Sequence, residues 1–299
     1  MNLHTIDTGY FKLDGGAMFG VVPKSIWNKS NPADANNLCT WALRCLLIEV
    51  GKRLILVDTG IGNKQDAKFF SHYNLHGDVN LEDSLKSKGF SKKDITDVFL
   101  THLHFDHCGG AIIRSGDQLL PAFPNADYWS NEKHWSWAME PNEREKASFL
   151  KENILPIRER GRLRMVPLGE EEIGGTTATT GDKLTGGEPV TISFSNGFDI
   201  RIVNGHTRAM MLPQLKYKGR TIVFVADLLP SAGHLPIPYI MAYDMFPLTS
   251  LREKKAFLEE ALAGNYVLFF EHDPVNECCT LQKTEKGIRV KEFFSLKDL

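Results

Sequence analysis

Short β-rich runs of apolar residues recur along the chain, and glycine-containing turns separate many of them. Residues 43–50 and 53–57 flank Gly51-Lys52, and residues 95–100 form another run, so we expect a hairpin followed by a buried strand. After residue 190 the same pattern predicts three more hairpins and one more buried strand. These elements cover residues 190–203, 211–226, 281–294 and 266–270.

Helical spacing of apolar residues predicts a smaller number of helices between these strands. Residues 81–88 and 251–263 are each followed by a glycine, the usual residue at a helix end. Residues 14–23 predict a turn followed by a short strand. Between residues 111 and 188 the spacing of apolar residues changes. In the 111–188 region we expect helices at 131–139 and 143–154, a strand at 162–166 and a Gly/Thr-rich loop at 174–187.

No shift in composition marks a linker, so we expect one domain over residues 1–299. Along the chain, strands are followed by a helix and then by a strand that ends in polar residues, and this series occurs twice. The region at about 111–188 would be an insert that shapes specificity.

A cluster of metal-ligating side chains directly follows the run at 95–100. His102 and His104 are two positions apart, so a strand that ends in a loop can point both at one ion. Asp106 and His107 come one turn later and suit a second ion. A loop that is merely rich in histidine is the plain alternative, but chance clustering of this density is rare. The stretch therefore predicts a metal site.

Three further candidate ligands stand where apolar strands end. His206 follows 199–203, Asp227 follows 221–226, and His272 follows 266–270. Each alone could be a capping or hydrogen-bonded residue. Together with the histidine cluster they fit one pattern, because sheet proteins assemble their sites at strand ends.

Composition removes several classes of function. With 42% hydrophobic and 24% charged residues in a chain of 299, a globular protein with a sizeable core is expected. The net charge of -2 gives no electrostatic case for a nucleic-acid partner, and no apolar run reaches transmembrane length. The first fourteen residues do not resemble a signal peptide, and five cysteines do not form a disulfide framework. We expect a cytoplasmic protein.

The sequence Thr-His-Leu-His-Phe-Asp-His at 101–107, preceded by Asp58-Thr59-Gly60, resembles the metallo-β-lactamase superfamily over nearly the whole chain. The resemblance implies an α/β fold, the four-layer αβ/βα sandwich in which two mixed sheets pack face to face with helices outside. It also implies how the ligands are shared. One metal would be held by His102, His104 and His206, the other by Asp106, His107 and His272, and Asp227 would bridge them.

Within the superfamily the ligand set implies hydrolysis. Oxygen-reducing members carry Glu at the position of His104, and the phrase at 102–110 resembles the acyl-homoserine lactonases. These often carry Tyr three residues after the bridging Asp, where this chain has Pro230. The expected function is a dinuclear hydrolase that opens a lactone or carboxylic ester, with N-acyl-homoserine lactones as candidate substrates. A phosphotriesterase or arylesterase on the same site is the alternative; a nuclease and a non-catalytic binding protein fit less well.

The expected cofactors are two divalent metal ions, with zinc first and manganese, iron or cobalt as alternatives. Such a pair lowers the pKa of a shared water, and the hydroxide attacks the ester carbonyl. Asp106 could carry the proton to the leaving group. Asp58 is predicted either to accept a hydrogen bond from a ligand imidazole or to cap its strand. His234 is predicted as a catalytic residue at the pocket rim, where it would contact substrate, with a surface-loop histidine as the alternative.

Five large apolar side chains could wall a cleft for an acyl or aryl group, and the partner would be a small-molecule ester or lactone. Ordinary packing of the inserted helices and a homodimer interface are the two alternatives, because aromatics at helical spacing are more often core. The candidates are Met18, Phe19, Trp129, Trp135 and Trp137.

Overall fold

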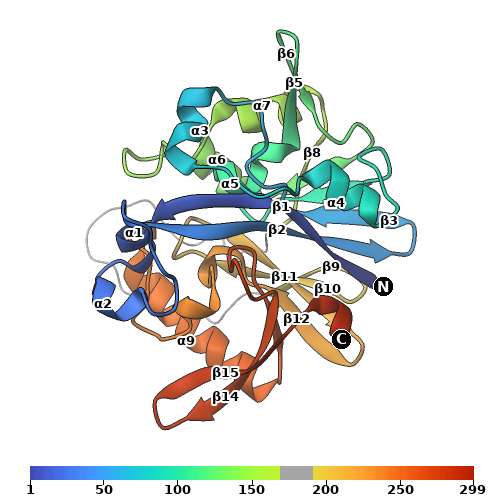
Figure 1. Ribbon diagram of the computed structural model, residues 1–299. Coiled ribbons are helices and arrows are strands. Elements are labelled where there is room, and N and C mark those ends of the chain that lie inside the picture. The colour runs from blue at the N-terminus through green and yellow to red at the C-terminus, as the bar shows by residue number, and fades with distance from the viewer. Residues whose placement is uncertain (169–190) are drawn as a thin grey trace, which may run out of the picture.

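The computed structural model describes residues 1–168 and 191–299. Two mixed β-sheets pack face to face, and helices cover their outer faces (Figure 1). The first sheet has the strand order β1-β2-β3-β4-β7-β8 and the second β15-β14-β13-β12-β11-β10-β9. This layering is the αβ/βα sandwich expected from the sequence. The predicted loop at 174–187 lies outside the described residues.

The strands and helices have the following bounds. The first sheet comprises β1 (Asn2–Asp14), β2 (Leu38–Val50), β3 (Arg53–Val57), β4 (Asp97–Phe99), β7 (Asp127–Ser130) and β8 (Leu163–Met165). The second comprises β9 (Thr191–Ser195), β10 (Phe198–Val203), β11 (Met210–Tyr217), β12 (Arg220–Phe224), β13 (Val267–Phe269), β14 (Cys278–Thr284) and β15 (Gly287–Phe294). A separate hairpin joins β5 (Ile112–Ser115) to β6 (Gln118–Pro121). The α-helices are α1 (Gly15–Phe19), α2 (Lys24–Trp27), α3 (Ala67–Tyr73), α4 (Leu81–Ser87), α5 (Phe105–Cys108), α6 (Glu132–Met139), α7 (Lys151–Glu159) and α9 (Pro247–Ala263). The 3₁₀ turns are η1 (Gly109–Ala111), η2 (Ala226–Leu228), η3 (Ala232–His234) and η4 (Leu296–Asp298).

Strand β2 shows why the predicted strands are nearly continuous runs of apolar residues. Its alternate side chains Leu46 and Ile48 belong to the core shared with the second sheet. Cys45 and Leu47 belong instead to the core under α4, α6 and α7. Because successive side chains of a strand point to opposite faces, a strand in a middle layer must be apolar at every position.

Most of the predicted hairpins and helices are confirmed. The hairpin at 43–57 is β2–β3, which pair antiparallel with Leu46 opposite Val57. The helices predicted at 81–88 and 251–263 are α4 and α9, and α9 ends at Gly264. Every one of the five cysteines is a buried free thiol. Among the described residues, no helix has the length and apolar character to cross a membrane.

Two local predictions are wrong. Residues 15–19 form helix α1 rather than a strand, because the Asp14 carboxylate accepts a hydrogen bond from the Ala17 amide (2.8 Å) and caps a helical turn. The helix expected at 143–154 begins only at Lys151. Its first residues instead form a turn in which Asn142 Oδ1 accepts the Arg144 and Glu145 amides.

The two sheets are tied together where their strands end. The amides of Ala42 and Arg44 in β2 donate to the carbonyls of His272 and Glu271, which follow β13 (both 3.1 Å). The buried Arg44 guanidinium donates to the Phe270 carbonyl (2.9 Å), and His272 Nδ1 donates to the Ala42 carbonyl (2.8 Å). These bonds fix the end of a second-sheet strand against the first sheet.

Two loops at the same edge pass in direct backbone contact. A Cβ at Gly109 would lie 2.1 Å from the Ile61 carbonyl oxygen, and a Cβ at Gly110 would lie 2.2 Å from that of Thr59. Both distances are shorter than any side chain tolerates, so the loop after α5 can pass the loop after β3 only with glycine at these positions.

We predict that Gly109→Ala destabilises the protein by about 1–3 kcal/mol, because the added methyl meets rigid backbone. Urea denaturation of the variant and of wild type measures the change in the free energy of unfolding. Gly16→Ala is the control, since its methyl meets side-chain atoms rather than backbone, at 3.0 Å from Asp14 Oδ1 and 3.7 Å from Asn37 Nδ2. Equal losses in the two variants would contradict the prediction.

Candidate metal centre

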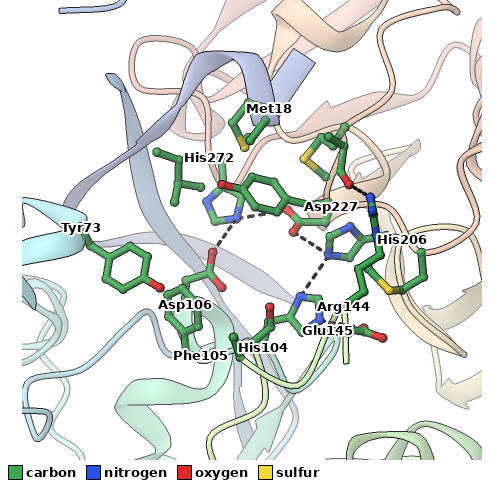
Figure 2. Close-up of a pocket in the computed structure, with 18 residues that line it drawn as sticks. Met18, Tyr73, His104, Phe105, Asp106, Arg144, Glu145, His206, Asp227 and His272 are labelled. Carbon is green, nitrogen blue, oxygen red and sulfur yellow. Dashed lines mark hydrogen bonds and ion pairs between the residues drawn. The ribbon is translucent and has the colours of Figure 1, made fainter. Parts of the chain in front are cut away.

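Seven histidine and aspartate side chains converge at the edge where the strands of both sheets end (Figure 2 shows five of them). Their exposed fractions lie between 0 and 8%. They are His102 and His104 after β4, Asp106 and His107 in α5, His206 after β10, Asp227 in η2 and His272 after β13. All seven residues predicted as ligands are therefore brought together.

The first group consists of three imidazoles and one carboxylate, with ligand atoms within 4.8 Å of one another. His104 Nδ1 lies 3.1 Å from both His102 Nε2 and His206 Nε2. Asp227 Oδ2 lies 3.0 Å from His206 Nε2. Three nitrogens and an oxygen that face a common point form the donor set of a divalent cation.

The second group contains Asp106, His107 and His272. His107 Nε2 and His272 Nε2 are 3.2 Å apart, and Asp106 Oδ2 lies 3.8 Å from each. Asp227 also reaches this group, because its Oδ1 lies 3.2 Å from His272 Nε2. The Asp227 carboxylate thus lies between the two groups, since its Oδ2 is also 3.5 Å from His107 Nε2.

Two of the three imidazoles of the first group are oriented by buried carboxylates, whereas His102 Nδ1 lies 3.1 Å from the Thr101 hydroxyl. His206 Nδ1 lies 2.9 Å from Asp244 Oδ1, and His104 Nε2 lies 3.0 Å from Glu145 Oε1. Trp137 Nε1 donates to the other oxygen of Glu145 (2.6 Å). Such outer hydrogen bonds fix which ring nitrogen faces a metal and make that nitrogen a better donor.

Asp58 lies where it can accept a hydrogen bond from a ligand imidazole, as one of its two predicted roles requires. Its Oδ2 is 3.1 Å from His107 Nδ1, and its two oxygens accept the amide and hydroxyl of Thr101 (2.8 and 2.6 Å). Glu271 Oε2 is also 3.0 Å from His107 Nδ1, which carries at most one hydrogen. Burial raises the pKa of Glu271 to about 8, which favours the neutral form of this carboxyl.

The charge balance of the site favours cations. Although burial opposes it, the carboxylates of Asp227 and Asp244 raise the pKa of His206 to about 10. Burial opposes the same effect at His272, where Asp227 raises the pKa to about 9. Positive charge is therefore held around a buried carboxylate, and a divalent ion can supply it in place of protons. The residues present fit metal ions.

A cavity of about 360 Å³ opens onto the cluster (Figure 2). Its wall is largely apolar, with a few polar groups among the apolar ones. The side chains include Leu13, Met18, Phe105, Met241 and Met245, together with Tyr73, Arg144 and Tyr243. Cavities of this size and character are typical of small-molecule sites.

Of the five side chains predicted to wall the cleft, only Met18 lines this cavity. Phe19, Trp129, Trp135 and Trp137 are absent from the lining of this cavity in the described residues, so the prediction that they wall it is wrong. Trp129 packs beside Phe194 with ring centroids 4.9 Å apart, and Trp135 lies in the core under the helices. Ordinary packing, one of the two alternatives, is what the structure shows for them.

The prediction that His234 lies at the pocket rim is also wrong, and so is its alternative as a surface histidine. The ring is 1% exposed and stacks on Phe19 at 4.4 Å. Its Nδ1 lies 2.9 Å from the Ser231 hydroxyl, and its Nε2 lies 2.9 Å from the Met18 carbonyl. Both nitrogens are engaged in holding the 231–234 turn against α1.

The sequence analysis missed the carboxylates that orient the ligands. Glu145 and Asp244 lie in turns with no periodic pattern, 41 and 38 residues from the histidines they contact. Only Glu271 carries a local signal, since it directly precedes His272 at a strand end.

Comparison with known proteins agrees with this geometry. The family model described as "Metallo-beta-lactamase superfamily" matches residues 44–272. The chain is similar in structure to a probable metal-dependent hydrolase from Staphylococcus aureus (24% identity, TM-score 0.83, 100% of this chain and 98% of that one). It is also similar to AidC, a dizinc quorum-quenching lactonase (20%, 0.75, 98% and 95%), and to the hydrolase AbOPH of the β-lactamase superfamily (21%, 0.71, 96% and 92%). None of the curated proteins compared with the chain matches it.

We predict that Glu145→Gln weakens metal binding by roughly 10- to 100-fold, because the charge that orients His104 is lost. Competition with a chromogenic chelator measures the affinity of the variant. The exposed Glu140→Gln, at the residue that directly follows α6, is the control and should bind metal like wild type. An unchanged affinity in Glu145→Gln would show that this carboxylate does not tune the site.

We also predict that His134 makes the protein lose stability in acid. Its Nε2 accepts the Leu103 amide (2.9 Å), its Nδ1 donates to the Arg208 carbonyl (2.6 Å), and burial lowers its pKa to about 4. Since the histidine of an unfolded chain has a pKa near 6.5, this stabilisation is complete above pH 6.5 and is lost as the pH falls through 4.

Urea titrations between pH 6.5 and 4 should therefore show a shallower loss of unfolding free energy in His134→Gln than in wild type. The exposed His72→Gln should follow the wild-type curve. Parallel curves for His134→Gln and wild type would refute the assignment.

Proposed function

Because the chain belongs to the metallo-β-lactamase superfamily, whose model matches residues 44–272, we propose that the protein is a metal-dependent hydrolase that opens a lactone or a carboxylic ester. Two divalent ions serve the reaction, with zinc first and manganese, iron or cobalt as alternatives. His102, His104 and His206 would hold one ion and Asp106, His107 and His272 the other, with Asp227 shared between them.

One observation carries this proposal. A buried carboxylate, Asp227, stands between two groups of ligand atoms, and the cluster opens onto a cavity with a largely apolar wall. A purely structural metal site would be closed, whereas a catalytic one keeps an open position for substrate.

When bound, two such ions lower the pKa of a water and polarise the carbonyl oxygen of an ester. A side chain of the protein transfers the protons. Asp106 lines the cavity, so its carboxylate can take the proton of the attacking water and pass it to the leaving oxygen. The new carbon–oxygen bond replaces the ester bond, and the products are a carboxylate and an alcohol, which stay in one molecule when the substrate is a lactone.

The cavity favours an acyl ester or lactone over a highly charged substrate. Methionines 18, 241 and 245 give the wall flexible apolar surface that adapts to a chain of carbon atoms. Among the structures similar to this one, AidC is described as a quorum-quenching lactonase. We therefore place lactones first and N-acyl-homoserine lactones among the substrates to test.

Metal-loaded enzyme should be assayed against N-acyl-homoserine lactones, aliphatic lactones, aryl esters and paraoxon. We expect turnover of lactones, loss of that turnover after dialysis against a chelator, and its return with zinc or manganese. Turnover of paraoxon alone would replace our proposal with a phosphotriesterase. Activity that survives complete metal removal would end the proposal.

We predict that Asp227→Ala lowers kcat/KM by at least about 10³-fold, because the shared ligand of both groups is lost. Its metal content, measured by elemental analysis, should fall as well. Asp117→Ala, which removes an exposed carboxylate on the β5–β6 hairpin, is the control and should retain wild-type turnover. Wild-type rates in Asp227→Ala would remove this residue from the site.

A further inference from the structure

Two tyrosines line the cavity, and within the described residues neither hydroxyl has a hydrogen-bond partner. Tyr73 is the last residue of α3, and Tyr243 lies in the segment between η3 and α9. Figure 2 shows the Tyr73 hydroxyl pointing toward Asp106. A phenol without a partner, beside the carboxylate proposed to carry protons, is a free donor at the point where the reaction takes place.

The ring of Tyr73 is held firmly in this position. The ring centroid of Tyr73 lies 4.7 Å from that of Phe105 and 4.9 Å from that of Phe69. Phe105 stands between the candidate ligands His104 and Asp106. Helix α3 starts at an aspartate cap, where Asp66 accepts the Phe69 amide (2.7 Å). These contacts hold the Tyr73 ring beside the segment that carries His104 and Asp106. A preorganised hydrogen-bond donor requires such a defined position.

The hydroxyl is also protonated under working conditions. The ordinary pKa of a tyrosine hydroxyl is about 10. At neutral pH the group therefore donates a hydrogen bond and does not act as a base. Tyr243 also lines the cavity and is 38% exposed, and burial raises its pKa to about 12.

We propose that Tyr73 is a catalytic residue that donates a hydrogen bond to the leaving oxygen of the substrate. This inference rests on the proposed function. If Asp106 passes its proton to the leaving oxygen, that oxygen must lie beside Asp106, and the Tyr73 hydroxyl points to the same place. As the ester bond breaks, negative charge grows on this oxygen; Tyr73 stabilises it and keeps its own proton, while Asp106 supplies the proton that forms the alcohol.

The test compares Tyr73→Phe with wild type on two substrates of similar acyl part, both with metal-loaded protein. An aliphatic lactone has a poor leaving group that needs stabilisation, whereas a p-nitrophenyl ester has a good one that does not. We expect kcat for the lactone to fall roughly 10- to 100-fold and kcat for the p-nitrophenyl ester to change by less than about 3-fold. Tyr217→Phe, at the far end of β11, is the matched control and should leave both rates unchanged.

Other outcomes overturn the inference in distinguishable ways. A general folding or metal-binding defect in Tyr73→Phe would lower both rates equally, and this result contradicts a role at the leaving oxygen. Unchanged rates on both substrates contradict it as well. If wild-type protein with its metals hydrolyses neither substrate, the proposed function itself fails, and the role of Tyr73 fails with it.

Discussion

The structure depends on holding the carboxylate of Asp227 in a buried place between imidazoles from both sheets. A buried charge costs several kcal/mol unless opposite charge and hydrogen bonds surround it. The surrounding imidazoles come from separate strand ends, so the cluster forms only when the two sheets bring their edges to one place. Packing of the sheets and assembly of the site are thus the same event.

The backbone near the site is strained where this assembly requires it. Asp58 has a φ of 57°, a left-handed conformation that side chains other than glycine rarely adopt. Its carboxylate accepts two hydrogen bonds from Thr101 and faces His107, which offsets the cost. Arg44 acts similarly from β2 by binding the carbonyl that precedes Glu271. The groups that orient the ligands therefore also hold the strand ends.

A feature of this protein could be predicted from the sequence when the residues that form it lie close together in the chain. His102, His104, Asp106 and His107 are read from one local motif, and the other ligands follow because apolar strands deliver them. Their partners Glu145 and Asp244 lie in irregular turns, and only the tertiary fold brings them to the histidines.

The prediction that the aromatic residues wall the cleft was wrong for another physical reason. The spacing of Trp135 and Trp137 shows that a helix has an apolar side but not which layer that side contacts. Trp135 faces the core, and the Trp137 indole reaches Glu145 from behind the ligand. Because His104 shares Glu145 with this indole, the electron density that its imidazole offers an ion depends on α6. Exchanging that helix would therefore change how strongly the His104 imidazole can donate electrons without altering any of the seven candidate ligand side chains.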